Sequence, residues 1–168
     1  HDLIAIREAR GEFPRQKKSR LGRLQQKWIE RWLRSASALV PVSHLTKTDA
    51  DRILGEDVQI LNPILQALNY PYRPIDAGVA QDRLGEVGSF DAPFLLHVGN
   101  PSWYKDRERV LRIWRQARKP RPDLQLVFVG APIEVKPGEA DHVHFFSGLS
   151  PEQLEALYAL ALALVFPS

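Results

Sequence analysis

The most constraining feature of this sequence is the stretch from Phe94 to Gly130. It begins with a short apolar run that ends at Gly99, continues through a loop containing Lys105, and becomes an amphipathic helical pattern before a second apolar run. Two buried strands joined by a helix form a βαβ unit, which belongs to a parallel sheet. Because ligands of such sheets bind beyond the carboxyl ends of the strands, chemistry is expected at the loop from Gly99 to Lys105 and at Gly130.

Further strands and helices alternate on both sides of this unit. Four more short strands are predicted from apolar runs, at residues 38–43, 58–61, 143–146 and 162–166. A helix is expected to begin at Ser43 or Thr46 and to end at Gly55. Another is opened by a capping box formed by Ser150 and Gln153. This alternation predicts the α/β class with Rossmann-like parallel sheets.

The composition changes between Asn69 and Asp91, where Pro and Gly are frequent and hydrophobic periodicity is weak. Such a change is typical of a connection between domains. We therefore expect residues 1–75 to belong to one domain, residues 76–90 to be an interdomain linker, and residues 91–168 to belong to a second domain. Since the chain lacks an initial Met and stops after an apolar run, we expect both domains to be truncated.

The composition argues against several kinds of site. The 168 residues contain no Cys, which excludes disulfides, thiolate metal sites and a cysteine nucleophile, and which fits a cytoplasmic protein. His142 and His144 are two residues apart, but no third ligand has a suitable spacing, so no metal site is predicted. No apolar run approaches the length of a membrane span.

Positive charge is concentrated at the start of the chain. Residues 1–34 hold ten Lys or Arg and four acids, a net charge of +6, and the remainder holds thirteen and sixteen, or −3. Residues 20–34 predict an amphipathic helix. Its apolar stripe contains Leu21, Leu24, Trp28 and Trp32, and its basic stripe contains Arg20, Arg23, Lys27, Arg31 and Arg34. Packing through the Trp face is the favoured interpretation, ahead of contact with an anionic membrane or with a phosphate-bearing substrate.

The loop after Gly99 has the elements of an anion site. A turn with exposed backbone N–H groups before a helix attracts negative charge, and Lys105 supplies a compact cation. The sequence has neither a Gly-x-Gly-x-x-Gly fingerprint nor a Walker Gly-Lys-Ser/Thr motif, so a dinucleotide or P-loop enzyme is not supported. Considered alone, these residues are best explained as a turn and a solvated helix start.

The order of the motifs is more specific than any one of them. In the second half they are Val98-Gly99, Lys105, Val129-Gly130, the segment from Val143 to Gly148, Leu157-Tyr158 and Pro167-Ser168. In the first half they are His1-Asp2, Val42-Ser43 and Asn62-Pro63. This series closely resembles the retaining GT-B-type glycosyltransferases of group 1, family four, and it covers nearly the whole chain.

The resemblance implies a two-domain GT-B enzyme that moves a sugar from a nucleotide diphosphate sugar to a glycan or glycolipid acceptor, with retention of the anomeric configuration. It implies no metal or other cofactor, no nucleic-acid partner, and a role in polysaccharide biosynthesis. Residues 1–75 would be part of the acceptor-side domain, and residues 91–168 part of the nucleotide-sugar-binding domain. The basic helix would bring the protein to the inner face of a membrane.

The resemblance also assigns residues to the donor phosphates. Lys105 would neutralise the diphosphate, with the backbone N–H groups of Gly99 and Asn100 nearby. Many members of the family have Arg where this sequence has Asn100. Arg107 would then supply the second cation.

Other residues are assigned to the remaining parts of the substrates. Gly130 and the turn formed by Ser147, Gly148 and Leu149 would border the base and ribose. His1 matches the catalytic His-Asp loop that faces the sugar and the acceptor. The Glu-containing loop of the family would follow residue 168, so these 168 residues are expected to bind nucleotide weakly and not to catalyse transfer.

Two alternatives remain open. A nucleotide-sugar epimerase of the same fold would share the diphosphate site but would use no acceptor. A non-catalytic module that binds a membrane or nucleic acid through the basic helix would bind in a strongly salt-dependent way and would tolerate the loss of Lys105.

Overall fold

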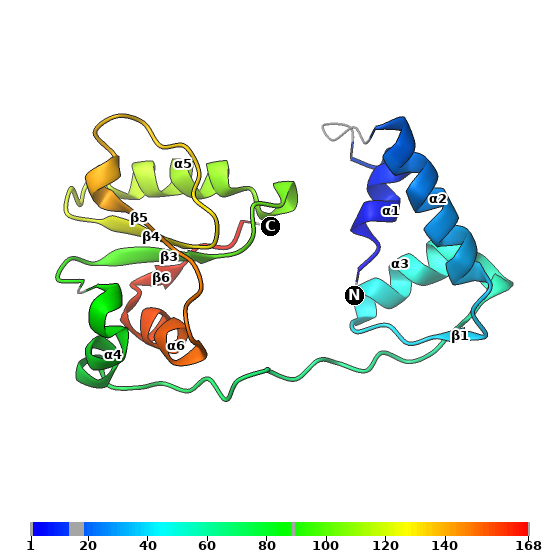
Figure 1. The fold of residues 1–168 in the computed structure, drawn as a ribbon, viewed down its shortest axis with the longest axis horizontal. Coiled ribbons are helices and arrows are strands. Elements are labelled where there is room, and N and C mark those ends of the chain that lie inside the picture. The colour runs from blue at the N-terminus through cyan, green and yellow to red at the C-terminus, as the bar shows by residue number, and fades with distance from the viewer. Residues whose placement is uncertain (1, 14–18, 89, 168) are drawn as a thin grey trace. The chain divides into compact units, whose positions relative to one another are not determined.

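The computed structural model describes residues 2–13, 19–88 and 90–167 (Figure 1). The chain divides into two compact units, His1–Asn69 and Tyr70–Ser168. Each unit has its own hydrophobic core.

The first unit consists of short helices around a small sheet. Its elements are α1 (Ile4–Ala9), α2 (Arg20–Arg34), β1 (Ala38–Leu39), α3 (His44–Leu54), the 3-10 helix η1 (Gly55–Asp57) and β2 (Gln59–Ile60). The two strands pair in parallel. The core contains Ile6, Ala50, Ile53 and Leu54. Helix α3 begins after Ser43, whose side chain accepts a hydrogen bond from the Thr46 N–H, and ends at Gly55, as predicted.

Helix α2 has the predicted bounds, but its Trp face is not the packed face. Ile29 and Leu33 pack against the core of the first unit, whereas Trp28 and Trp32 are 62% and 60% exposed. The favoured interpretation of this helix is therefore wrong. Helical periodicity identified the apolar arc, but α1 and α3 cover only the part of that arc that carries Ile29 and Leu33.

The second unit is a three-layer α/β domain. Its elements are α4 (Ala77–Leu84), η2 (Gly85–Val87), β3 (Phe94–Val98), η3 (Trp103–Lys105), α5 (Arg107–Ala117), β4 (Gln125–Val129), η4 (Ala140–His142), β5 (Val143–Phe146), α6 (Pro151–Leu160) and β6 (Ala163–Leu164). The strand order is β5-β4-β3-β6, and all neighbours are parallel. The α/β fold with parallel sheets is thus confirmed.

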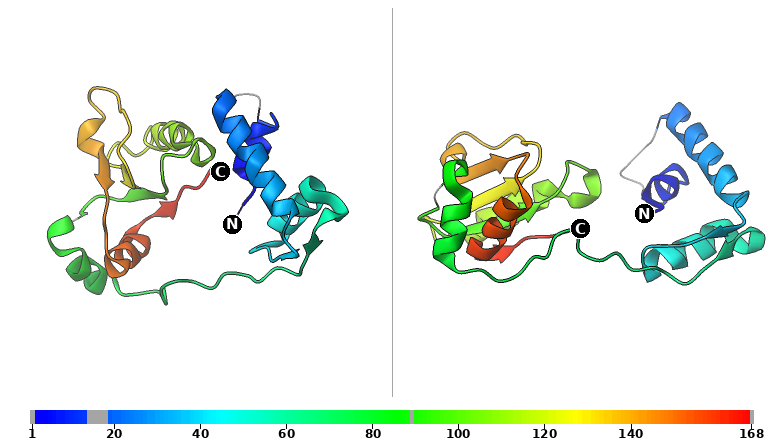
Figure 2. Two further views of the ribbon diagram at one scale, coloured as in Figure 1. Left: turned by 45° about the vertical axis from the view of Figure 1, so that its right-hand side comes forward. Right: turned by 60° about the horizontal axis from the view of Figure 1, so that its bottom comes forward.

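Helices cover both faces of this sheet (Figure 2). Helix α5 buries Val110, Leu111 and Trp114 against one face, which includes Leu95 of β3. The other face, with Phe94 and Leu96, packs against α4 and α6. Because β3 is buried on both faces, its continuous apolar run has a direct structural explanation.

The structure differs from the predicted linker at residues 76–90. This segment contains α4 and η2, and Ala80 and Leu84 are completely buried beneath the sheet of the second unit. Two apolar residues four positions apart suffice to bury one face of a short helix, although they make a weak periodic signal. The stretch without helix or strand is instead residues 61–76.

Candidate functional site

Three residues follow the carboxyl ends of adjacent strands in the second unit. Gly99 follows β3, Gly130 follows β4, and Ser147 follows β5. The Gly99 N–H donates to the Val129 carbonyl oxygen at 3.0 Å, and the Gly130 N–H donates to the Phe146 oxygen at 2.7 Å. These bonds extend the sheet by one residue. The Gly99 N–H was expected to contact the donor phosphates, but it is already used within the sheet.

The backbone at Gly130 has a conformation that favours glycine. Its φ is +135°, and a Cβ at this position would lie well under 3.0 Å from the carbonyl oxygen of Gly99. Strands β3 and β4 therefore meet closely at the edge where ligands of parallel sheets bind.

Lys105 lies at this edge, at the end of η3. A Cβ at Gly99 would lie 3.5 Å from Cγ of Lys105, so the aliphatic stem of the lysine passes beside the glycine. The Lys105 ammonium lies 4.2 Å from the centroid of the Phe166 ring, in a cation–π contact. Within residues 2–13, 19–88 and 90–167, this ammonium forms no ion pair, so its charge is available to an anionic ligand.

The amino terminus of α5 is occupied by a side chain. Asp106 has a left-handed backbone (φ 41°), and its carboxylate accepts a hydrogen bond from the Arg109 N–H at 3.2 Å. It also forms a 3.0 Å ion pair with the Arg109 side chain. A carboxylate thus already caps one of the backbone donors at the start of this helix and places a negative charge beside the others.

Asn100 provides a further backbone donor in the loop. Its side-chain oxygen accepts a hydrogen bond from the Ser102 N–H at 3.1 Å, which shapes the turn. Its own N–H has no hydrogen-bond partner among the residues that the structure describes. Lys105 and the Asn100 N–H are thus two groups of this loop that could contact an anion.

Arg107, which the resemblance assigned to the donor phosphates, is buried. Only 5% of its surface is exposed, and its guanidinium lies 4.7 Å from the centroid of the Phe128 ring. One terminal nitrogen donates to the Ala131 carbonyl oxygen. The Nε and the other terminal nitrogen are buried without a partner in the described part of the chain. Burial lowers the pKa of this arginine, and its charge lies directly beneath the turn after β4.

His97 is a polar residue of the site that the sequence analysis missed. It is completely buried in β3, and its Nδ1 lies 2.8 Å from the Val165 carbonyl oxygen, to which it donates. The Nε2 has no partner among the described residues and would lie 3.3 Å from a Cβ at Gly99. Burial lowers the pKa of His97, and the charges of Arg107 and Lys105 lower it further. The sequence did hold a signal for this residue, because His97 is the only polar side chain in the apolar run from Phe94 to Val98.

The turn after β5 begins next to Phe146, whose carbonyl oxygen accepts the hydrogen bond from the Gly130 N–H. Ser147 and Gly148 are exposed, Gly148 has a φ of +70°, and Leu149 packs against the core. The catalytic assignment of His1 lies outside the described residues. Within the described ranges, no group of three His, Asp or Glu side chains could hold a metal ion.

Comparison with known proteins places the fold. No protein-family model and no curated protein matches the sequence. The structure is similar to the crystal structure of Anabaena Alr3699/HepE in complex with UDP and glucose, with a TM-score of 0.58 and 14% sequence identity. The match covers 78% of this chain and 38% of the HepE chain, so this chain spans well under half the length of that protein. The chain therefore has a mixed α/β, Rossmann-like fold with parallel sheets that is similar to part of that structure.

Proposed function

We propose that the protein transfers a sugar from a nucleotide diphosphate sugar to a glycan or glycolipid acceptor, with retention of the anomeric configuration. The observation that carries this proposal is Lys105, a cation without an ion-pair partner in the described residues, beside Gly99 at the carboxyl edge of a parallel sheet. The fold is similar to that of a protein solved with UDP and glucose, which are the two parts of such a donor. The order of motifs supports retention and a role in polysaccharide biosynthesis.

The proposed chemistry depends on charge. When the bond between the sugar and the diphosphate breaks, negative charge develops on the diphosphate, and fixed donors stabilise that charge. Lys105 and the Asn100 N–H would contact the phosphates. Arg107 would act from beneath the turn after β4, where its buried charge has no acidic partner among the described residues. Because burial excludes water, its field at the edge of the sheet is weakly screened.

The other assigned residues would complete the donor site. Gly130 would hold the edge of the sheet in the required conformation, and Ser147, Gly148 and Leu149 would border the base and ribose. His1 is proposed to face the sugar and the acceptor, on the strength of its His-Asp motif. A glycolipid acceptor would bring the protein to a membrane surface in the cytoplasm. The 168 residues alone would bind nucleotide without turnover.

Nucleotide titration tests the donor site. UDP, GDP and ADP would be added to the protein, with binding followed by calorimetry and by the fluorescence of Trp103, which is adjacent to the loop. Lys105→Ala should weaken binding of the preferred nucleotide by about 10- to 100-fold, the effect of losing one charged hydrogen bond. Lys119→Ala, which removes an exposed lysine beyond α5, is the matched control. Equal affinity of the wild type and Lys105→Ala would contradict the proposal.

Retention needs a separate experiment. The full-length protein would be incubated with the nucleotide sugar that the titration selects and with a candidate acceptor. The anomeric configuration of the product would then be read by NMR spectroscopy. An inverted product would contradict the retaining mechanism and would leave the donor site intact.

A further inference from the structure

Two buried basic side chains pack on the Phe128 ring near the carboxyl edge of the second unit's sheet. The His97 ring contacts Phe128 edge to face, with their centroids 5.4 Å apart, and the Arg107 guanidinium lies 4.7 Å from the same centroid. In the described part of the chain, three of the four buried side-chain atoms without a hydrogen-bond partner belong to these two residues. Since buried polar atoms are normally hydrogen-bonded, this cluster indicates a site for a ligand.

The contacts of His97 fix its tautomer. Its Nδ1 donates to the Val165 carbonyl oxygen at 2.8 Å, so the neutral ring has its unshared lone pair at Nε2. That nitrogen is buried without a partner among the described residues, and it would lie 3.3 Å from a Cβ at Gly99. The free nitrogen of His97 therefore lies next to the turn that Gly99 begins.

The charged groups that act on His97 are cations. Burial lowers the pKa of the imidazole most, and Arg107 of α5 and Lys105 of η3 lower it further. Asp106, between these two residues, is bound by the side chain and the N–H of Arg109. The uncharged neighbours from β4 and from the segment after β6 are Phe128, Val165 and Phe166. The ring is therefore neutral at neutral pH, and a bound anion would offset the two cations.

Lys105 is a neighbour of the buried imidazole as well as the proposed phosphate ligand. Its Cγ and Cδ would lie 3.5 and 3.6 Å from the same Cβ position at Gly99 that Nε2 of His97 approaches. Its ammonium lies 4.2 Å from the centroid of Phe166. The Phe166 ring in turn stacks on His97, with their centroids 6.3 Å apart. A movement of Lys105 would thus change the surroundings of His97.

We propose that His97 is a further phosphate-binding residue, which is neutral in the free protein and protonated in the complex with a nucleotide diphosphate sugar. The phosphates would draw the Lys105 ammonium away from Phe166, and the lysine stem would uncover Nε2. The imidazole would take one proton from the solvent at Nε2, and the new N–H would donate to a phosphate oxygen. The Nδ1–H would stay on Val165. The inference rests on the proposed function, since it needs the diphosphate at this edge of the sheet.

The proton is favoured in the complex because the ligand changes the local charge. A diphosphate esterified at both ends carries two negative charges, which offset those of Lys105 and Arg107. A nearby opposite charge and a hydrogen bond to the charged form both favour a protonated histidine. The complex then holds a proton that the free protein lacks. Affinity must therefore fall as the pH rises through the range in which the two states differ in protonation.

Calorimetry with UDP-glucose, GDP-glucose and ADP-glucose tests this linkage on the intact protein. These diesters are used because the terminal phosphate of a free nucleoside diphosphate titrates in the same range. The affinity of the probe that binds should fall by about tenfold from about pH 5.5 to about pH 8.5, the ratio expected if binding strengthens the hold of His97 on its proton tenfold. Titrations in two buffers of different ionisation enthalpy should show uptake of part of one proton at neutral pH.

Two histidine variants separate His97 from the other groups. His97→Gln keeps a neutral polar side chain in β3 and should abolish both the pH dependence and the proton uptake. Its affinity should equal that of the wild type at high pH, where His97 is neutral in both states. His144→Gln is the matched control, because the Nε2 of His144 is also buried without a partner among the described residues, and burial lowers the pKa of this histidine too. It should keep both properties of the wild type.

NMR spectroscopy of the wild type observes the His97 ring directly and needs no variant. With the ring nitrogens labelled and assigned, the free protein at neutral pH should show the neutral Nδ1–H tautomer. A saturating concentration of the probe that binds should convert the ring to the charged form. A purely structural role of His97 would leave the ring neutral in both states.

The failure of this proposal differs from the failure of the proposed function. Binding that depends on Lys105 but not on pH, without proton uptake, would overturn the role of His97 and leave the donor site in place. A His97 ring that is charged in the free protein, or neutral in the complex, would do the same. So would a His97→Gln variant with the pH dependence of the wild type. If none of the three probes binds, the donor site fails and the role of His97 fails with it.

Discussion

Gly99 and Gly130 lie back to back at the carboxyl ends of β3 and β4. The space that a Cβ would take at Gly130 is occupied by the carbonyl oxygen of Gly99. The Gly99 N–H, in turn, donates to the oxygen of Val129, the residue before Gly130. The two turns that carry the proposed phosphate and nucleotide contacts are thus packed as one structure.

We expect Gly130→Ala to lower the free energy of unfolding of the second unit by about 2–4 kcal/mol. The positive φ disfavours a side chain, and the new Cβ would overlap the backbone of Gly99. Urea denaturation followed by circular dichroism measures the change. Gly138→Ala, where φ is +80° but no atom lies within 4 Å of the new Cβ, controls for backbone strain. Equal losses in both variants would mean that the contact with Gly99 has no effect.

Arg107→Met separates a structural role of this arginine from a role in binding. An unpaired buried charge is costly because no partner repays its desolvation, and an apolar side chain of similar length removes that cost. The variant loses the hydrogen bond to the Ala131 oxygen and the cation–π contact with Phe128. We therefore expect the free energy of unfolding to stay constant or rise, while nucleotide affinity falls. Thermal unfolding and nucleotide titration test both expectations. A large loss of stability with unchanged affinity would show that Arg107 serves the fold.

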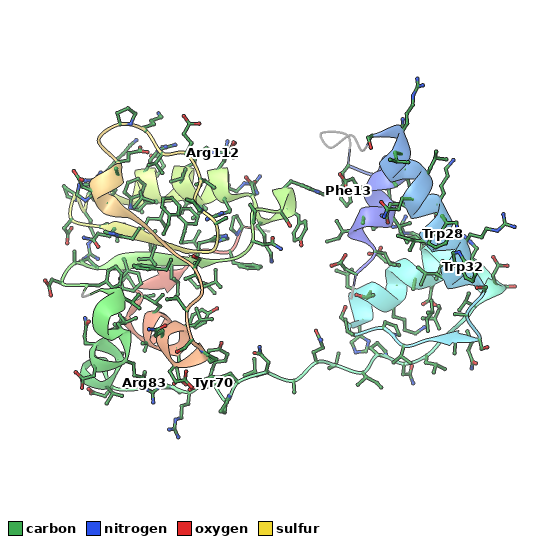
Figure 3. The ribbon with its side chains drawn as sticks, in the orientation of Figure 1. Phe13, Trp28, Trp32, Tyr70, Arg83 and Arg112 are labelled. Carbon is green, nitrogen blue, oxygen red and sulfur yellow. The ribbon has the colours of Figure 1, made fainter. Side chains whose placement is uncertain are left out.

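Glu155 connects the start of the second unit to α6. Its carboxylate is buried, accepts a 2.8 Å hydrogen bond from the Arg73 N–H, and pairs with Arg83, which is labelled in Figure 3. The Arg73 N–H is the main reason why the pKa of this carboxyl is lowered. Glu155→Ala should lower the urea midpoint and expose the chain around Arg73 to proteolysis, because both donors lose their acceptor. Glu134→Ala removes an exposed acid and should change neither.

The stability of the first unit should depend on pH through Glu12. Hydrogen bonds from Arg52, and then from Arg7, lower the pKa of Glu12 to about 2 from an ordinary value of 4.5. A lowered folded-state pKa means that the stabilisation is complete above pH 4.5 and is lost as the pH falls toward 2. Glu12→Gln should flatten this part of the unfolding profile. Glu56→Gln, at an exposed site, should leave the slope unchanged, and an equal slope in Glu12→Gln would contradict the expectation.

Local patterns in the sequence were sufficient for many of the elements, although not for α1 and α4. The bounds of α2, the capping box at Ser150 and Gln153, and the βαβ unit from Phe94 to Gly130 are present as predicted. Each of these features depends on the periodicity and the hydrogen-bonding groups of residues only a few positions apart. They can therefore be recognised without knowledge of the tertiary structure. The parallel sheet then follows from the order of strands and helices.

Tertiary structure decided which faces are covered and which groups remain available. Periodicity placed Trp28 on an apolar face that was expected to be packed, yet Trp28 is exposed, whereas Arg107, expected to contact the donor phosphates, is buried. Their environments depend on neighbours distant in sequence, such as Phe128 beneath Arg107. The Gly99 N–H was likewise taken by Val129, thirty residues away. Sequence therefore determined most of the elements and the position of the proposed phosphate loop, whereas packing between distant segments determined which charges and donors of that loop a ligand could use.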